Sequence, residues 1–320
     1  MVNKKSKIFI AGHNGLVGNA VYKKFKKEGF KKLIIVDKKK LNLINQSDVD
    51  LFFRKNKFDY LIMCAAKVGG IMSNSTYPTE FLYENIMIQS NLLKAAFKYK
   101  VKRTIFLGTS CIYPKFAKTP IKEKYLLSGK LEKTNEFYAI AKISGIKLCE
   151  AMHKQYNFDV VCVMPTNMYG TKDNHDNFNS HVIPGIISKV FEAKKREKNK
   201  LELWGSGKPK REFLFVDDFA NAIYLIINKT RNEINKNSKN QFPIYNVGSG
   251  EELSIKELAF KIKRIFNYKG KVFFNTKFPD GTFKKNLDSG KIIKLGWKAK
   301  VKLEDGLKML IENYSQKIKR

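Results

Sequence analysis

The sequence predicts an α/β fold in which helices cover both faces of a doubly wound parallel sheet, with a smaller, interrupted α/β domain beside it. Two observations predict this fold. Short apolar runs alternate with longer helical patterns through the first half of the 320-residue chain, as is typical of a parallel sheet that is buried on both faces. From about residue 169 this alternation gives way to loop-rich sequence, which predicts the second domain.

The first apolar run, residues 7–11, leads into three glycines spaced as GxxGxxG and then into a helical pattern that extends to Gly29. Glycines between a strand and a helix let the backbone approach a pyrophosphate, and the helix N-terminus supplies N–H groups and a positive dipole. This spacing favours a Rossmann domain of the short-chain dehydrogenase type over a simple turn. We therefore expect a nucleotide to bind Gly12, His13, Asn14, Gly15, Leu16, Val17 and Gly18.

The second apolar run, residues 33–36, ends where the adenosine ribose of such a nucleotide is expected. Asp37 follows, and a carboxylate there would accept hydrogen bonds from the 2′-hydroxyl of NAD. Residues 38–40 are lysines, which would favour the 2′-phosphate of NADP. These residues alone leave the choice of nucleotide open.

Further apolar runs over residues 60–66, 104–108 and 160–164 predict the remaining strands, and helices are predicted over 81–99 and 138–156. Ligands bind at the carboxyl edge of a parallel sheet, so residues that follow these strands are expected to line one crevice.

The rest of the chain is expected to form loops over residues 169–211, a helix from about Val216 that packs on the nucleotide domain, and an exposed polar connector over 232–240. The predicted division is a nucleotide-binding domain over residues 1–168 plus about 216–230, and a substrate-binding domain over residues 169–215 and 231–320.

Tyr138 and Lys142 stand four residues apart on a predicted helix and therefore share a face. The ammonium can then lower the phenol pKa from about 10 and make Tyr138 a proton donor near neutral pH. Tyr22 and Lys26 have the same spacing, so the pair alone is not specific. Only Tyr138 follows a strand that ends in hydroxyl-bearing residues, at 109–110, which could hold a substrate oxygen.

The net charge of +33 would attract any polyanion. The positive residues are almost all lysines and are spread along the whole chain, whereas a nucleic-acid groove concentrates charge and favours arginine. We therefore expect no specific nucleic-acid partner.

Cysteines and histidines show no metal-binding spacing such as CxxC or HxxxH, so reduced thiols and no metal are expected. No apolar run approaches the roughly 20 residues that span a bilayer, and the basic start does not resemble a signal peptide. These features predict a cytoplasmic protein without a membrane partner.

Motifs along nearly the whole chain resemble those of the GDP-L-fucose synthases, a family of epimerase/reductases within the extended short-chain dehydrogenases/reductases. The motifs are Ile10-Ala11-Gly12-His13, 65–71 (AAKVGGI), 110–115 (SCIYPK), 138–142 (YAIAK), Met164-Pro165-Thr166-Asn167, 179–184 (NSHVIP), Trp204-Gly205-Ser206-Gly207, Arg211-Glu212-Phe213 and Pro279-Asp280-Gly281-Thr282.

The resemblance implies conversion of GDP-4-keto-6-deoxy-D-mannose to GDP-L-fucose, by epimerisation at C3 and C5 and then NADPH-dependent reduction at C4. It implies that Cys111 removes the proton and that His181 returns one from the opposite face. Tyr138 would then protonate the C4 oxygen, with Lys142 lowering its pKa and binding the nicotinamide ribose. Thr109 would hydrogen-bond the same oxygen.

The resemblance also implies the binding residues. Besides the glycine loop, NADP(H) is expected to contact Lys38, Leu107, Gly108, Thr109, Lys142, Pro165, Thr166, Asn167, Met168 and His181. The GDP-sugar is expected to contact Lys189, Trp204, Arg211 and Asp280. Two chains are expected to form a homodimer through the helices over 81–99 and 138–156.

Four positions depart from the family pattern: Thr109 stands for serine, Phe137 for proline and Lys189 for arginine, while Asp37 is unusual beside a 2′-phosphate. Lys189 also lacks the bidentate fork of an arginine. Lys38 occupies the position where the family often uses arginine for this phosphate.

Two alternatives remain. The first is a reductase or epimerase/reductase of a different nucleotide-4-ketosugar, and the presence of both Cys111 and His181 argues against reduction alone. The second is a non-catalytic basic Rossmann protein that binds NADP or nucleic acid. The set of Thr109, Tyr138 and Lys142 argues against it.

Overall fold

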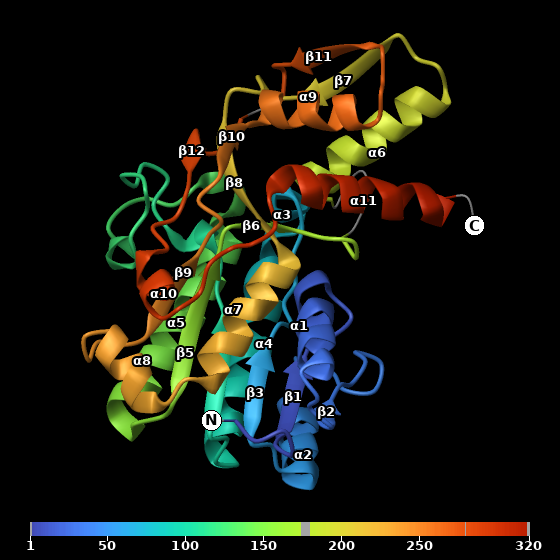
Figure 1. The fold of residues 1–320 in the computed structure, drawn as a ribbon. Coiled ribbons are helices and arrows are strands. Elements are labelled where there is room, and N and C mark those ends of the chain that lie inside the picture. Colours follow the sequence, from blue (N-terminus) through green and yellow to red (C-terminus); the bar gives the residue numbers. More distant parts are fainter. Residues whose placement is uncertain (1, 174–179, 279, 319–320) are drawn as a thin grey trace.

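The structure, a computed structural model, describes residues 2–173, 180–278 and 280–318, so that two motif residues, Asn179 and Pro279, and also His175 lie outside the described residues. Its centre is a parallel sheet (Figure 1). In the order in which they pair, the strands are β2 (Lys32–Ile34), β1 (Lys7–Ala11), β3 (Tyr60–Met63), β4 (Arg103–Leu107), β5 (Val160–Pro165) and β9 (Ile244–Val247). The predicted doubly wound α/β fold is confirmed.

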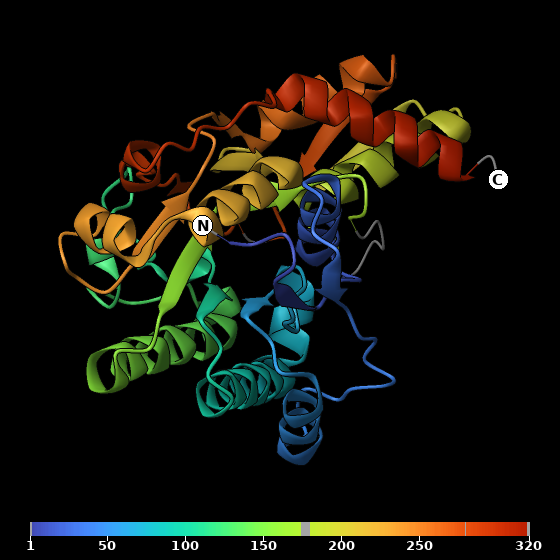
Figure 2. The same ribbon diagram turned by 60° about the horizontal axis from the view of Figure 1, so that its bottom comes forward.

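Helices cover both faces of this sheet because successive side chains along each strand point to opposite sides. On β1, Ile8 and Ile10 belong to one apolar core, whereas Phe9 and Ala11 belong to another. Figure 2 shows the two helical layers with the strands between them. The first core contains α1 (Leu16–Lys27), α7 (Val216–Asn228), α8 (Arg231–Asn237) and α10 (Gly290–Lys294), and the second contains α2 (Gln46–Asn56), α4 (Pro78–Lys98) and α5 (Glu136–Tyr156).

A third core lies beyond the carboxyl edge of the main sheet and joins a small mixed sheet to a strand pair and three helices. The small sheet contains β6 (Asn167–Tyr169), β8 (Lys210–Phe215), β10 (Glu252–Ser254) and β12 (Lys284–Lys285), and the pair is β7 (Lys200–Trp204) with β11 (Lys271–Asn275). The helices are α6 (Val182–Lys195), α9 (Ile255–Ile265) and α11 (Leu303–Ile318). Shorter elements at the edge between the cores are α3 (Ile71–Thr76), η1 (Ser110–Ile112), η2 (Glu123–Tyr125) and η3 (Lys133–Asn135).

The prediction of loops over residues 169–211 is wrong at α6, which occupies fourteen of them, and also at β7 and at the start of β8. Four apolar residues at helical spacing, Ile183, Ile186, Ile187 and Val190, are buried on one side of it. Pro184 lies within this pattern, and a proline in a sequence usually indicates a loop or the end of a helix. Proline is tolerated in the first turn of a helix because the N–H that it lacks has no partner within the helix there.

The predicted exposed connector over residues 232–240 is also wrong, because most of it belongs to α8. Thr230 and Glu233 form a reciprocal capping box at its start, and Ile234 is buried in the first core. The next strand, β9, pairs with β5. The division predicted at residue 231 therefore differs from the arrangement of the sheet, and we propose that the nucleotide domain also includes α8 and β9.

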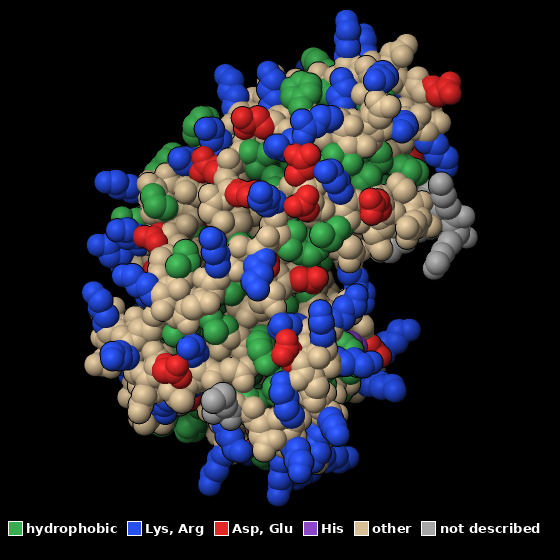
Figure 3. Space-filling model, viewed as in Figure 1, with side chains coloured by type: hydrophobic (Ala, Val, Ile, Leu, Met, Phe, Trp, Pro, Cys, Tyr) green, Lys and Arg blue, Asp and Glu red, His purple; other side chains and the backbone are tan. Residues whose placement is uncertain are grey.

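On the face that Figure 3 shows, charged side chains are spread over the surface rather than gathered in one groove. Figure 3 shows lysines and arginines over the whole visible face, with acidic residues among them. No helix within the described ranges combines the length and apolar character that a membrane crossing requires.

Arg103 joins the amino ends of two strands to the end of α7. Its guanidinium donates to both carboxylate oxygens of Asp159, at 2.9–3.1 Å, and to the carbonyl oxygens of Ile226 and Lys229. The side chain of Arg103 is buried, so these bonds are shielded from water. A bidentate pair of this kind is costly to break from one side, since the carboxylate is then left without its partner.

We predict that Arg103→Met lowers the free energy of unfolding by about 3 kcal/mol, measured by urea denaturation. The matched control is Lys98→Met, which removes the exposed ion pair with Asp50 (2.7 Å) and is expected to have a much smaller effect, because water screens an exposed pair. Equal losses in the two variants would contradict the structural role of Arg103.

Candidate active site

A cleft of about 1060 Å³ extends from the glycine loop after β1, across the ends of β4 and β5, to the third core. Of the glycine-loop residues and the site residues that the family resemblance implied, all line this cleft except Leu107 and Lys142. These two lie just behind its wall, where the Lys142 ammonium donates to the carbonyl oxygen of Leu107 at 2.9 Å. The structure thus brings the predicted set together in one place.

The glycine loop is shaped for a phosphate group. Gly12 has a φ of +86°, and a Cβ there would lie 2.5 Å from the backbone nitrogen of Ala65. A Cβ on Gly18 would collide with the carbonyl oxygen of Gly12. Gly15 precedes α1 and provides no side-chain cap, so the first N–H groups of the helix are left for a ligand. These features fit the pyrophosphate of a dinucleotide.

Asp37 and Lys38 differ in their contacts at the end of the cleft where the adenosine is expected. The Asp37 carboxylate accepts a hydrogen bond from the amide of Asn14 and lies 3.6 Å from Nε2 of His13. Lys38 lines the cleft, whereas Asp37 does not. The carboxylate is therefore engaged by the glycine loop, and the cation is the group that faces a ligand.

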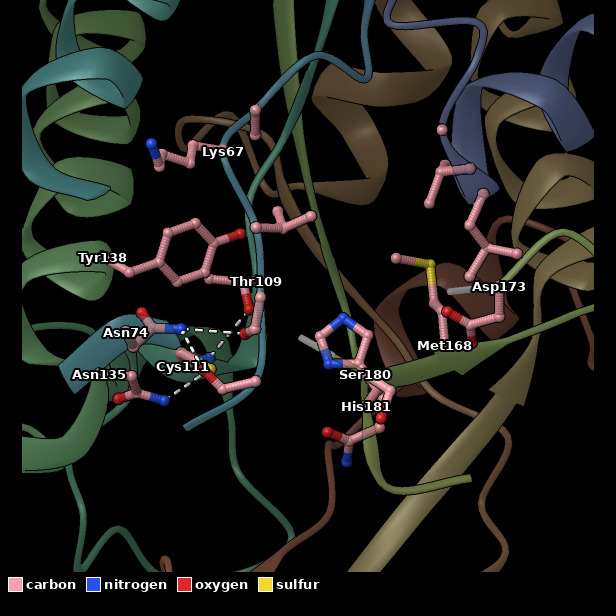
Figure 4. Close-up of a pocket in the computed structure, with 18 of the residues that line it drawn as sticks. Lys67, Asn74, Thr109, Cys111, Asn135, Tyr138, Met168, Asp173, Ser180 and His181 are labelled. Atoms are coloured by element: carbon pink, nitrogen blue, oxygen red, sulfur yellow. Dashed lines mark hydrogen bonds between the residues drawn. The ribbon is translucent and has the colours of Figure 1, made fainter. Parts of the chain in front are cut away.

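Thr109 and Cys111 stand at the reactive end of the cleft, just after β4. The hydroxyl oxygen of Thr109 accepts from the backbone N–H of Cys111 at 3.3 Å, so its own hydrogen can be donated elsewhere. The Cys111 sulfur accepts from the amide of Asn135 at 3.2 Å. Figure 4 shows these residues and Tyr138 on one side of the pocket and His181 on the other.

Tyr138 and Lys142 lie on α5, as predicted, but the expected effect on the pKa of Tyr138 is not found. Burial raises the pKa of the phenol well above 10, and interaction with Cys111 adds to this shift. Burial also lowers the pKa of Lys142, from 10.5 to about 8. The ring of Phe81 meets the Tyr138 ring edge-on at 6.1 Å and fixes its orientation. Tyr138 is therefore a fully protonated phenol held in place.

His181 is the residue immediately before α6, where its extended backbone (φ −73°, ψ 170°) begins the helix. Solvent reaches its side chain, but the protein atoms that surround the ring lower the pKa of His181 below 6.5. The imidazole is therefore mostly neutral at pH 7. Its position across the pocket depends on the packing of α6 in the third core.

The far end of the cleft holds the predicted sugar-nucleotide contacts. Trp204 stacks on Phe278 with ring centroids 4.5 Å apart, and the Lys189 ammonium lies 4.3 Å from the Trp204 ring centre. Arg211 lines the same region from β8. The Asp280 carboxylate accepts from the backbone N–H and hydroxyl of Ser206, at 2.9 and 2.6 Å, and so also holds the turn after β7.

The family model of the NAD dependent epimerase/dehydratase family matches residues 8–248, which include the glycine loop, Tyr138 and Lys142. The chain belongs to this family. Among the residues that the structure describes, no group of three or more His, Cys, Asp and Glu side chains is arranged to hold a metal ion.

The similarity to other proteins extends over almost the full length of this chain. The GDP-L-fucose synthase of Escherichia coli is 45% identical over 303 residues, which cover 95% of this chain and 94% of that protein. A solved GDP-6-OMe-4-keto-L-xylo-heptose reductase from C. jejuni has a TM-score of 0.92 at 36% identity and covers 99% of each chain. A GDP-L-fucose synthetase from Naegleria fowleri, bound to NADP, has a TM-score of 0.86 at 25% identity, covering 100% of this chain and 97% of the other.

Two residues of the site had no predicted role. Asn135 immediately precedes the helix of Tyr138, and only its contact with the Cys111 sulfur distinguishes it. Lys285 comes from β12 and places its ammonium 3.8 Å from the same sulfur. No local signal marks Lys285, because lysine is abundant throughout the chain.

We predict that Lys38→Met weakens NADP⁺ binding about tenfold or more, because a hydrogen bond to a charged group contributes about 1.5–3 kcal/mol. NAD⁺ binding, which involves no 2′-phosphate, should change little. Calorimetric titration of both nucleotides measures the difference, and Lys39→Met is the control because Lys39 does not line the cleft. Equal weakening of both nucleotides would show that Lys38 does not read the 2′-phosphate.

Proposed function

We propose that this protein converts GDP-4-keto-6-deoxy-D-mannose to GDP-L-fucose, by epimerisation at C3 and C5 followed by NADPH-dependent reduction at C4. The observation that carries this proposal is the presence of Cys111 and His181 on opposite sides of one pocket that also contains Tyr138. A thiol and an imidazole so placed can act on the two faces of one carbon. The similarity to the E. coli GDP-L-fucose synthase supports the same substrate.

The 4-ketone makes the hydrogens on C3 and C5 acidic, because the electron pair left behind is shared with the C4 oxygen. Cys111, as thiolate, removes the proton from one face. His181 returns a proton to the opposite face and so inverts the carbon. The low pKa of His181 means that the imidazole must first bind a proton from solvent, which its exposed position allows.

Residues of the first part of the cleft hold the cofactor in this proposal. The N–H groups after Gly15 would bind the pyrophosphate, and Lys38 the 2′-phosphate. NADPH, when bound, supplies the hydride that reduces C4. The NADP-bound Naegleria fowleri structure supports this choice of nucleotide.

Tyr138 is the proton donor for the C4 oxygen. Its raised pKa keeps the phenol protonated at neutral pH, so the proton is available when negative charge develops on that oxygen. Thr109 can donate a second hydrogen bond to the same oxygen. Lys142 is held behind Tyr138 by the carbonyl of Leu107 and contributes positive charge there.

The nucleotide of the substrate would bind beside Trp204, with Lys189 and Arg211 facing its diphosphate. A second candidate function keeps the fold and cofactor but reduces a different GDP-ketosugar, and the resemblance to the C. jejuni heptose reductase favours it. The thiol of Cys111 opposite the imidazole of His181 favours the epimerase/reductase, since reduction alone needs neither group.

We further propose a homodimer formed through α4 and α5, which pack side by side. Large apolar side chains on these helices are exposed, among them Tyr83 (56%) and Ile140 (40%). A cytoplasmic location agrees with the four free cysteines.

Turnover of GDP-4-keto-6-deoxy-D-mannose with NADPH, with the product identified by NMR, tests the function. We predict that Cys111→Ser loses deuterium incorporation at C3 and C5 from D₂O. Tyr138→Phe should keep this exchange but lose C4 reduction by about 10²-fold or more, since it lacks the proton donor. Tyr22→Phe is a matched control with the same spacing to a lysine. Reduced but uninverted sugar from the wild-type protein would favour the second candidate function.

For the assembly, light scattering is expected to give twice the 37.0 kDa mass of one chain. Tyr83→Glu should shift the protein towards the monomer, because a carboxylate would be buried without a partner. Phe116→Glu changes an 87% exposed aromatic residue outside both helices and should leave the mass unchanged. A wild-type monomer would refute the proposed dimer.

A further inference from the structure

Lys285 is a buried lysine whose ammonium is aimed at the Cys111 thiol. It lies on β12, in register with Arg211 of the neighbouring β8, and only 8% of the residue is exposed. Its Nζ is 3.8 Å from the Cys111 sulfur. The side chain thus extends from β12 of the small sheet to Cys111, which follows β4 of the main sheet.

No carboxylate neutralises this ammonium within residues 2–173, 180–278 and 280–318. Glu132, an acid in the pocket wall, is paired with Lys115 at 3.1 Å and accepts from Thr282 at 3.3 Å. A buried cation is stable only when a partner compensates for lost water. The sulfur of Cys111 is the partner that the structure offers.

The other groups around the sulfur also favour negative charge on it. Asn135 donates its amide hydrogen at 3.2 Å. Arg211, on β8, interacts favourably with a charged Cys111 and also with Asp280 and Glu132. Tyr138, on α5, faces the sulfur as a neutral phenol. The described surroundings of Cys111 therefore combine two cations and an amide donor, and the carboxylates of Asp280 and Glu132 act on one of these cations, Arg211.

We propose that Lys285 is a positioning residue that, together with Asn135, holds Cys111 as the thiolate that removes the substrate proton. An ordinary cysteine has a pKa near 8.5, so only a few per cent is thiolate at pH 7. A nearby cation increases this fraction by stabilising the charged form.

This inference rests on the proposed function for its reaction. As the C–H bond breaks, its proton forms the S–H bond of Cys111, and its electron pair moves onto the C4 oxygen as an enolate. The new C–H bond forms with the proton held by His181. Cys111 then returns its proton to solvent, and the neighbouring ammonium of Lys285 favours this step.

Alkylation of Cys111 by iodoacetamide measures its thiolate content in the free enzyme, without substrate or cofactor. The rate is followed from pH 5 to 10 by mass spectrometry of the Cys111 peptide, which separates it from the peptides of the other cysteines. We expect Lys285→Met to slow alkylation at pH 7 about tenfold and to move the rise in alkylation rate to higher pH by about one unit, because no ammonium then lies 3.8 Å from the sulfur to stabilise the thiolate.

Two further variants make the test specific. Lys285→Arg keeps the charge and should retain most of the wild-type profile. Lys284→Met is the matched control, because Lys284 is the exposed neighbour that pairs with Glu252 at 3.4 Å. Its midpoint should not move. If Lys285→Met does not fold, as judged by circular dichroism, Asn135→Leu is tested instead. Removing its amide donor should also move the alkylation profile of Cys111 to higher pH, and an unchanged profile would contradict the inference.

Deuterium exchange at C3 and C5 without NADPH gives a second readout. Exchange by Lys285→Met should fall about tenfold at pH 7 and approach the wild-type rate near pH 9, where the thiol ionises without help. An unchanged alkylation profile in folded Lys285→Met would overturn the inference and leave Lys285 as a substrate contact, with a raised KM only. A shifted profile without turnover of the GDP-sugar would instead count against the proposed substrate alone.

Discussion

The close approach of two backbone segments at Gly12 is the constraint on which the site depends. Because any side chain there would meet the backbone of Ala65, the loop after β1 packs directly against the end of β3. The carbonyl of Gly12 in turn leaves no room for a side chain on Gly18, so α1 begins at the edge of the sheet. This contact places the free N–H groups of α1 beside the residues that follow β4. Cofactor and reactive groups can therefore meet at one edge.

The parts that could be predicted from the sequence are those that depend on local pattern. Five strands of the main sheet could be predicted because a sheet buried on both faces gives continuous apolar runs, and their ends differ from prediction by only a few residues, as at Met63. The sixth strand, β9, was not predicted. The glycine loop was readable from its spacing, and Tyr138 and Lys142 from the period of a helix. Their convergence followed from the rule that parallel strands end at the same edge.

The parts that could not be predicted depend on contacts between distant residues or on local signals that compete. Pro184 made the start of α6 resemble a loop, and the polar surface of α8 concealed one buried isoleucine, Ile234. The sequence places Asp37 beside Lys38 but does not show that the Asp37 carboxylate accepts a hydrogen bond from Asn14. Lys285 reaches Cys111 across 174 positions of the chain, and nothing in its neighbourhood distinguishes it from other lysines.

The two residues proposed for epimerisation are positioned by elements that pack in different cores. Cys111 follows β4 of the main sheet, whereas His181 begins α6, whose apolar face is buried in the third core. Tyr138 and Lys142, by contrast, share one helix of the main sheet's cores. Sequence divergence confined to the third core would therefore displace His181, the proposed proton donor for inversion, and leave Tyr138 and Lys142, the pair proposed for reduction, in place. A family built in this way can separate stereochemical inversion from reduction during evolution without rebuilding its nucleotide-binding half.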